Sequence, residues 1–210
     1  SLLQALGRFE EAEPLLRDAL ARREGALGTD HPDTLTSTNN LASLLQALGR
    51  FEEAEPLFRR VLQERRHALG PDHPSTLTSL NNLAALVWAL DRIEEAEPLF
   101  RRSLAARERV LGPEHPDTIG SLNNLGVLLQ ARGQLDEAEV LFKRAMETSE
   151  AVLGPDHPGT LGSVDSYAVL LHARGRFDEA EALVRRALDG YERVLGRDHP
   201  NTLACMNNLG

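Results

Sequence analysis

One block of sequence recurs along the whole chain at a fixed interval of 42 residues. The dipeptide His-Pro returns five times at this interval, and Leu-Gly precedes it each time. An acidic cluster around Ala12 returns around Ala54, Ala96, Ala138 and Ala180. Several markers locked to one period indicate an array of one duplicated unit. Such a chain folds as a stack in which each unit packs against its neighbours.

Each unit divides into two amphipathic stretches joined by a short turn. The first stretch begins at Pro74 in one unit and carries Leu77, Leu80 and Leu83 at helical spacing, so it predicts a helix, here named helix A. The second, over residues 93–111, starts with acidic residues that favour the helix dipole and ends before glycine, which predicts helix B. Neither helix can bury its apolar stripe alone, so the sequence predicts an all-α stack of helix pairs.

Small residues recur where the helices of the stack must approach each other. They are Ala42, Ala84 and Gly126 in helix A and Ala54, Ala96 and Ala138 in helix B. A larger side chain at these points would push the neighbouring helix away, so we expect all of them to be buried.

The pattern within one unit resembles the tetratricopeptide repeat. Its signature positions are Leu83, Ala84, Val87, Ile93, Ala96 and Phe100, with Asp91 in place of glycine. Three features look like the kinesin light chain type of this repeat: the long period, the run Leu-Asn-Asn-Leu-Ala in helix A and the run Glu-Ala-Glu-Pro-Leu in helix B. The resemblance covers essentially the whole chain. It implies a right-handed superhelical solenoid of antiparallel helix pairs whose role is to bind proteins.

We expect residues 1–210 to form a single array. Its parts are a partial repeat at 1–28 with the end of helix A and a helix B, complete repeats at 29–70, 71–112, 113–154 and 155–196, and the start of a helix A at 197–210. Both ends would expose apolar faces that a neighbour normally covers. This leaves a second hypothesis open, in which the chain is a structural spacer or associates with itself head to tail or by helix exchange.

Composition argues against several classes of partner. The chain has 23 basic and 32 acidic residues and a formal net charge of -9, with no block of Lys and Arg, so we expect no nucleic acid partner. No apolar run approaches the ~20 residues of a spanning helix, so we expect no membrane association. The single cysteine, Cys205, cannot form an internal disulfide and fits a reducing compartment, so we expect a cytoplasmic protein.

The repeated histidines do not predict a metal site. They are His31, His73, His115, His157 and His199. Residues that occur once per stacked unit form a row, whereas a metal needs converging ligands. We expect the acidic residue before each histidine to bond free N–H groups at the start of helix A. Serines and carboxylate pairs also recur at equivalent positions, unlike a unique active site, so we predict no enzyme activity, no cofactor and no metal.

The accessible side of helix A is the candidate binding site. With Leu80, Leu83 and Val87 in the stack, a turn of about 100° per residue places Asn81 and Trp88 on another side. Amides donate and accept hydrogen bonds, so a row of them suits the backbone of an extended peptide. The candidate residues are Asn39, Asn40, Gln46, Asn81, Asn82, Trp88, Asn123, Asn124, Gln130, Asp165 and His172.

Alternatives remain for several of these residues. Asn82 either faces the groove or bonds linker backbone within its own repeat, and Trp88 is either a binding hot spot or a core residue. Kinesin light chain repeats are similar in using groove asparagines for cargo peptides, which also need basic neighbours. The basic residues at the A–B turns here are Arg50, Arg92, Arg132 and Arg174. A further alternative is a sensor domain of a larger signalling ATPase.

Overall fold

The computed structural model describes residues 8–209. Over these residues the chain forms ten α-helices and no β-strand, which confirms the all-α prediction, and none of these helices is long and apolar enough to cross a membrane. The A helices are α3 (Pro32–Ala47), α5 (Pro74–Ala89), α7 (Pro116–Ala131), α9 (Pro158–Ala173) and α11 (Pro200–Leu209). The B helices are α2 (Phe9–Leu27), α4 (Phe51–Leu69), α6 (Ile93–Leu111), α8 (Leu135–Leu153) and α10 (Phe177–Leu195). The end of a helix A expected within residues 1–6 lies outside the described residues.

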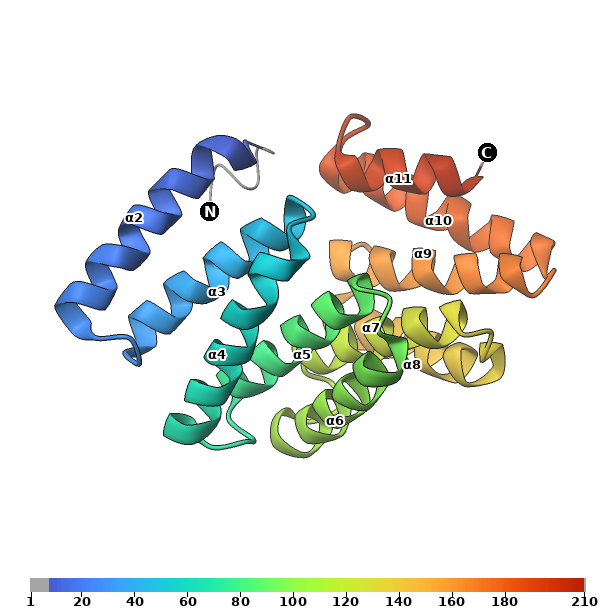
Figure 1. Cartoon of the computed structure of the whole chain (residues 1–210). Helices are drawn as coiled ribbons and strands as arrows, with labels where there is room; N and C mark the ends of the chain where they lie inside the picture. Colours follow the sequence, from blue (N-terminus) through green and yellow to red (C-terminus); the bar gives the residue numbers. More distant parts are fainter. Residues whose placement is uncertain (1–7, 210) are drawn as a thin grey trace. The chain divides into compact units, whose positions relative to one another are not determined.

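The chain divides into two compact units, Ser1–Val110 and Leu111–Gly210. In the first unit α2 packs against α3, α3 against α4 and α4 against α5. In the second unit consecutive helices from α7 to α11 pack in the same way, and Figure 1 shows α10 between α9 and α11. The A helices also contact each other, α3 with α5 and α7 with α9. The B helices α4, α8 and α10 therefore each bridge two A helices, as a stack of pairs requires.

Small residues lie where the helices approach each other, as the sequence predicts. Ala42 and Ala84 of the A helices have no exposed surface. At the equivalent position of α7 a Cβ on Gly126 would lie 2.9 Å from the ring of Phe142 in α8, closer than a Cβ normally comes to an aromatic carbon. Phe142 is itself fully buried, so the packing leaves this ring little room to move.

The N-cap of each A helix is the repeated histidine. In α3, α5, α7, α9 and α11 the imidazole Nδ1 accepts a hydrogen bond of 3.0–3.2 Å from the backbone N–H two residues later. Proline follows at the first helical position, where a backbone N–H would have no partner within the helix, so its absence loses no hydrogen bond. The prediction that the preceding acidic residue caps the helix is therefore wrong, because the histidine occupies the N-cap position itself.

One turn departs from the repeat in its residue but not in its backbone. Gly49, Gly133 and Gly175 follow A helices with φ of 73°, 75° and 75°, a region that suits glycine. Asp91 takes the same place in its repeat with φ of 59°. Aspartate tolerates this left-handed conformation better than most residues, which explains how the turn keeps its form.

Candidate functional site

In each compact unit the accessible side of the A helices, named here the A-helix face, carries the predicted binding residues of that unit. Every residue of this face is half-buried or exposed, and in α3, α5, α7 and α9 the residues between them are buried. It comprises Thr36, Asn39, Asn40, Ser43 and Gln46 in α3; Thr78, Asn81, Asn82, Ala85 and Trp88 in α5; Gly120, Asn123, Asn124, Val127 and Gln130 in α7; Gly162, Asp165, Ser166, Val169 and His172 in α9; and Ala204, Asn207 and Asn208 in α11.

Asparagines of this face connect neighbouring A helices. Asn82 of α5 donates from Nδ2 to Oδ1 of Asn39 in α3 at 3.1 Å. In the second unit Asn208 of α11 donates to both carboxylate oxygens of Asp165 in α9, at 3.1 and 3.0 Å. The structure thus gives Asn82 a role that the sequence alternatives did not contain. It links two repeats and does not bond the linker of its own repeat.

Asn123 makes a related bond one step along the second unit. Its Nδ2 donates to Ser163 Oγ of α9 at 2.9 Å, while its Oδ1 is buried and has no hydrogen-bond partner within the described residues. A buried acceptor without a hydrogen bond costs free energy, so a donor that reached Asn123 Oδ1 would stabilise it.

The last turn of the A helices presents a larger ring in two repeats. Trp88 in α5 is half-buried, and it is not among the fully buried residues of that helix. His172 at the equivalent position of α9 is exposed and meets Phe177 edge to face, with ring centroids 5.2 Å apart. Both rings therefore combine packing contacts with a solvent-accessible surface, as residues that bind partners often do.

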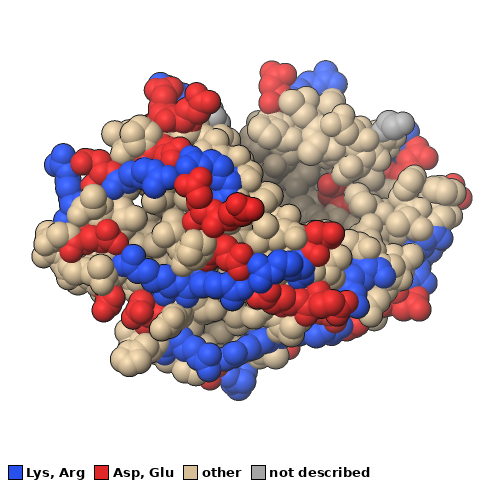
Figure 2. All heavy atoms as spheres, viewed as in Figure 1, with Lys and Arg blue, Asp and Glu red and all other residues tan. Residues whose placement is uncertain are grey.

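No lysine or arginine occurs in α3, α5, α7, α9 or α11. The charged residues of these helices are Asp33, Asp117 and Asp165, with His172 as the one titratable base. The cations of the protein lie on the B helices and in the turns, where Figure 2 shows blue and red side chains next to each other over the visible face. The A helices themselves therefore add no cation to the A-helix face. In the first unit two arginines of B helices reach it, because Arg65 of α4 lies 3.5 Å from Thr36 Oγ1 and Arg107 of α6 donates to Thr78 Oγ1 at 3.3 Å.

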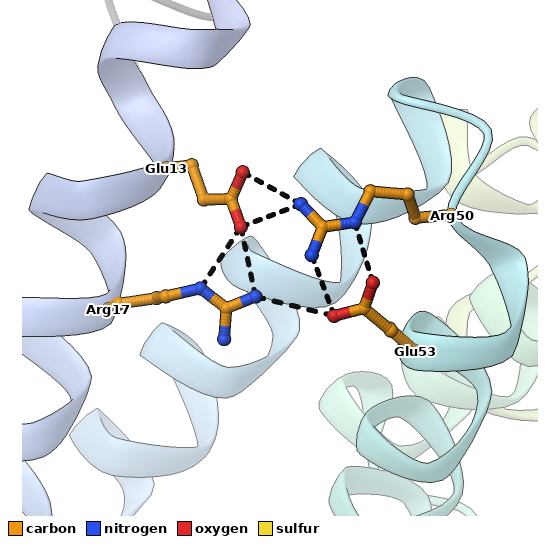
Figure 3. Close-up of polar contacts among 4 residues, drawn as sticks. All are labelled: Glu13, Arg17, Arg50 and Glu53. Atoms are coloured by element: carbon orange, nitrogen blue, oxygen red, sulfur yellow. Dashed lines mark hydrogen bonds and ion pairs between the residues drawn. The ribbon is translucent and has the colours of Figure 1, made fainter.

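Arginines at the A–B turns are engaged by carboxylates of the B helices (Figure 3). Arg50 Nη1 lies 2.7 Å from Glu13 Oε1, and Arg50 Nε lies 2.6 Å from Glu53 Oε1. Arg17 Nη2 approaches Glu13 Oε1 to 2.9 Å and closes the network. Hydrogen bonds from Arg17, and then from Arg50, hold the pKa of Glu13 below its usual range. A hydrogen bond from Arg50 lowers the pKa of Glu53 in the same way.

The same network recurs in other repeats. Arg92 pairs with Glu55 at 2.8 Å, and Arg176 pairs with Glu139 at 2.6 Å. Arg174 lies 2.7 Å from an oxygen of Asp136. These turn arginines thus join consecutive B helices. Their guanidinium groups are paired with carboxylates of the B helices and not with residues of the A-helix face.

A pocket of about 420 Å³ opens on the A-helix face between α7 and α9. Val127 and Val169 line it, and both are more than one-third exposed. Phe142 of α8 contributes to its wall from the core, and Asp165 of α9 adds a carboxylate. The remaining lining residues are Gln130, Ala131, Leu135, Ser166 and Ala173.

The described residues offer no metal-binding cluster and no activated thiol. Within residues 8–209 no group of three or more His, Cys, Asp or Glu side chains could hold an ion. Cys205 is fully buried, and burial raises the pKa of its thiol to about 12. At neutral pH this thiol is protonated and out of reach of a substrate, so it is a core residue.

A family model described as tetratricopeptide repeat matches residues 1–63, 36–109, 84–147, 117–163 and 162–210. The chain belongs to the tetratricopeptide repeat family. These matches leave no part of the chain uncovered, in agreement with the period read from the sequence. No curated protein matches its sequence.

Solved structures place these tetratricopeptide repeats with the kinesin light chain type. Crystallised nearly identical repeats assigned to a kinesin light chain of Podosopora anserina are 30% identical, with a TM-score of 0.72 and 92% of each chain covered. A single-substitution variant of these repeats is 29% identical to this chain, with a TM-score of 0.74. The match covers 91% of this chain and 90% of that chain. BtubC (BKLC) from P. vanneervenii is 28% identical to this chain, with a TM-score of 0.75. The match covers 95% of this chain and 79% of that chain.

The positions of the amides in the sequence do not predict the pocket between α7 and α9. The signal lay at one position of helix A, where Ser43, Ala85, Val127 and Val169 follow each other along the chain. The first unit has the small residues serine and alanine at this position and the second unit has valine in both repeats, so only the second unit presents a larger apolar surface there. Of the predicted residues, Gln130 and Asp165 line this pocket.

Proposed function

We propose that this tetratricopeptide repeat array is a protein-interaction scaffold that binds an extended segment of a partner protein along the A-helix face. The observation that supports it most is that the A helices of each compact unit present amides and small polar groups on their accessible side and contain no lysine or arginine. Such a row can bond the backbone of an extended chain and leaves side-chain choice to the pockets beside it.

The kinesin light chain type of the repeats supports an adaptor or cargo-binding role as part of this proposal. The A helices supply none of the cations that a strongly acidic cargo peptide would need, and the arginines that reach the face from B helices, Arg65 and the buried Arg107, already bond its threonines. We therefore expect neutral or basic partner segments. A cytoplasmic place of action belongs to the proposal as well, supported by the single unpaired cysteine.

The test is selection of a random peptide display library on the folded protein and on an Asn81→Ala, Trp88→Ala variant. We expect the wild-type chain to enrich a sequence consensus and the variant to lose it, because both changed side chains lie on the A-helix face of α5. A Gln63→Ala, Arg66→Ala variant on exposed positions of α4 is the matched control and should retain the consensus.

Two outcomes would count against peptide binding at this face. A consensus that survives in the Asn81→Ala, Trp88→Ala variant would place the site elsewhere. If no peptide is enriched and light scattering shows association at high concentration, the competing proposal of a spacer or self-association module gains support. Circular dichroism of each variant establishes that it has folded.

A further inference from the structure

The pocket between α7 and α9 differs from the rest of the A-helix face in being apolar with a carboxylate at its side. Val127 and Val169 line it and expose 36% and 37% of their surface. The equivalent residues of the first unit are Ser43 and Ala85. An exposed pair of valines over a buried phenylalanine favours an aliphatic side chain of a ligand.

Asp165 gives the pocket its charge. The other complete repeats carry asparagine at this position, namely Asn39, Asn81 and Asn123. Asp165 is half-buried, and Nδ2 of Asn208 bonds both of its oxygens. The Cys205 thiol also makes a hydrogen bond with Asp165. A carboxylate has about four lone-pair sites, so the amide and the thiol together leave acceptor capacity for a further donor.

No cation of the protein lines this pocket. Its walls contain neither lysine nor arginine, and α7 and α9 contain none along their whole length. Arg174 and Arg176, at the turn after α9, are paired with Asp136 and Glu139. A cationic group of a ligand would therefore find Asp165 without a competing arginine in the pocket wall.

We propose that the pocket is a specificity subsite for a basic-aliphatic partner segment, in which Leu, Ile or Val enters between Val127 and Val169 while a neighbouring Lys or Arg pairs with Asp165. The inference rests on the proposed peptide-binding function and adds the side-chain chemistry of the partner. A charge-assisted hydrogen bond to a half-buried carboxylate gives orientation, and the aliphatic contact gives affinity. The partner of this unit is thus a protein segment with positive charge.

The experiment extends the peptide selection to two variants that copy residues of other repeats. Asp165→Asn restores the amide of the preceding repeats, and Val127→Ala with Val169→Ala restores the alanine of α5. The matched control is Asp189→Asn, which makes the same charge change at an exposed position of α10 outside the pocket. Peptides from the wild-type selection are then synthesised with the basic residue changed to Gln or the aliphatic residue changed to Ala.

We expect the wild-type consensus to pair an aliphatic residue with Lys or Arg at a fixed offset. Asp165→Asn should weaken binding of the basic peptide roughly threefold to tenfold and leave its Gln version unchanged. The double valine variant should lose the preference for the aliphatic residue, and Asp189→Asn should behave as the wild type. High salt should reduce the effect of Asp165→Asn, since the pair is partly exposed.

The two proposals fail in different ways. A consensus without the basic-aliphatic pair, or one that Asp165→Asn and the double valine variant leave unchanged, overturns the subsite while peptide binding stands. An equal loss of affinity in Asp189→Asn would show that only net charge matters and would also overturn it. If the wild-type chain enriches no peptide, the proposed function fails and the subsite falls with it.

Discussion

At the scale of single residues, Gly190 sets how closely α10 approaches α9. A Cβ at this position would lie 2.5 Å from Cδ2 and 2.9 Å from Cδ1 of Leu161, which is itself buried. Gly120, within α7, has nothing within 4 Å of its missing Cβ. The two glycines therefore offer the same substitution in opposite surroundings.

We expect Gly190→Ala to lower the free energy of unfolding by about 1–3 kcal/mol, because the added methyl group overpacks the contact with Leu161. Gly120→Ala should raise it by up to about 1 kcal/mol through helix propensity. Urea denaturation followed by circular dichroism measures both. Equal effects of the same sign would contradict the packing described for α9 and α10.

The histidine caps lead to a second prediction at this scale. His73→Ala should reduce stability by about 0.5–1 kcal/mol, because the N–H of Ser75 loses its acceptor at the start of α5. His73→Asp should restore the loss, since aspartate is a strong N-cap. Thermal denaturation of the three proteins is the measurement. If both substitutions are equally destabilising, the imidazole has a role other than capping.

Single-residue roles were the part of the structure that the sequence predicted least well. A histidine and the acidic residue before it are both able to cap a helix, and only the backbone at the first turn decides between them. The bond from Asn82 to Asn39 depends on the register between two repeats, which the period alone does not contain. The pocket at Val127 required Phe142, a residue of a different helix.

At the scale of helices, the sequence predicted far more. Proline after histidine marks the start of each A helix and Leu-Gly marks the end of each B helix, so α5 begins at the expected Pro74 and α6 has the expected limits of Ile93–Leu111. Helical spacing also predicted the accessible side of the A helices. The apolar residues mark the sides of each A helix that are buried, and the polar residues between them mark the side that is left accessible.

The ion pairs between B helices give a prediction for pH. Arg17 and Arg50 lower the pKa of Glu13, and Arg50 lowers that of Glu53. The pairs therefore stabilise the fold above the unfolded Glu pKa of about 4.3, and this contribution disappears as pH falls through the lower folded values. Arg50→Gln, which copies Gln134 of another repeat, should be less stable than the wild type at neutral pH and approach it at about pH 3.

Urea midpoints at a series of pH values test this dependence. Arg22→Gln is the control, since Arg22 pairs with Asp18 within α2 and both are largely exposed. Its effect should be small at every pH. A difference between Arg50→Gln and the wild type that persists unchanged in acid would mean that the arginine stabilises by packing and not by charge.

At the scale of the whole molecule, each compact unit contains its own natural probe. Trp88, the only tryptophan, lies in the first unit, and Cys205, the only cysteine, lies in the second. The Cys205 thiol is buried and its pKa is raised by burial, so a thiol reagent reaches it only after opening of that unit. Stability of the two units can therefore be followed separately in one sample.

Ala54→Phe and Ala180→Phe overpack the same helix-B position in the first and the second unit, where both alanines are buried. Each substitution should cost about 1–3 kcal/mol. Because repeat proteins are stabilised by neighbour contacts, Ala54→Phe should shift the Trp88 fluorescence transition more than Cys205 labelling, and Ala180→Phe should do the reverse. Equal shifts of both probes in both variants would indicate a single cooperative transition.

The ion-pair network has a consequence for how such a protein changes over generations. Glu13 meets Arg50 and Glu139 meets Arg176 across the same separation of 37 residues. A repeat that has both the glutamate and the turn arginine pairs its carboxylate with the arginine of the following repeat and its guanidinium with the glutamate of the preceding repeat. Recombination that duplicates or removes a whole unit would then create a junction whose partners already match. The length of the protein could grow or shrink in steps of one repeat without the selection of a new interface.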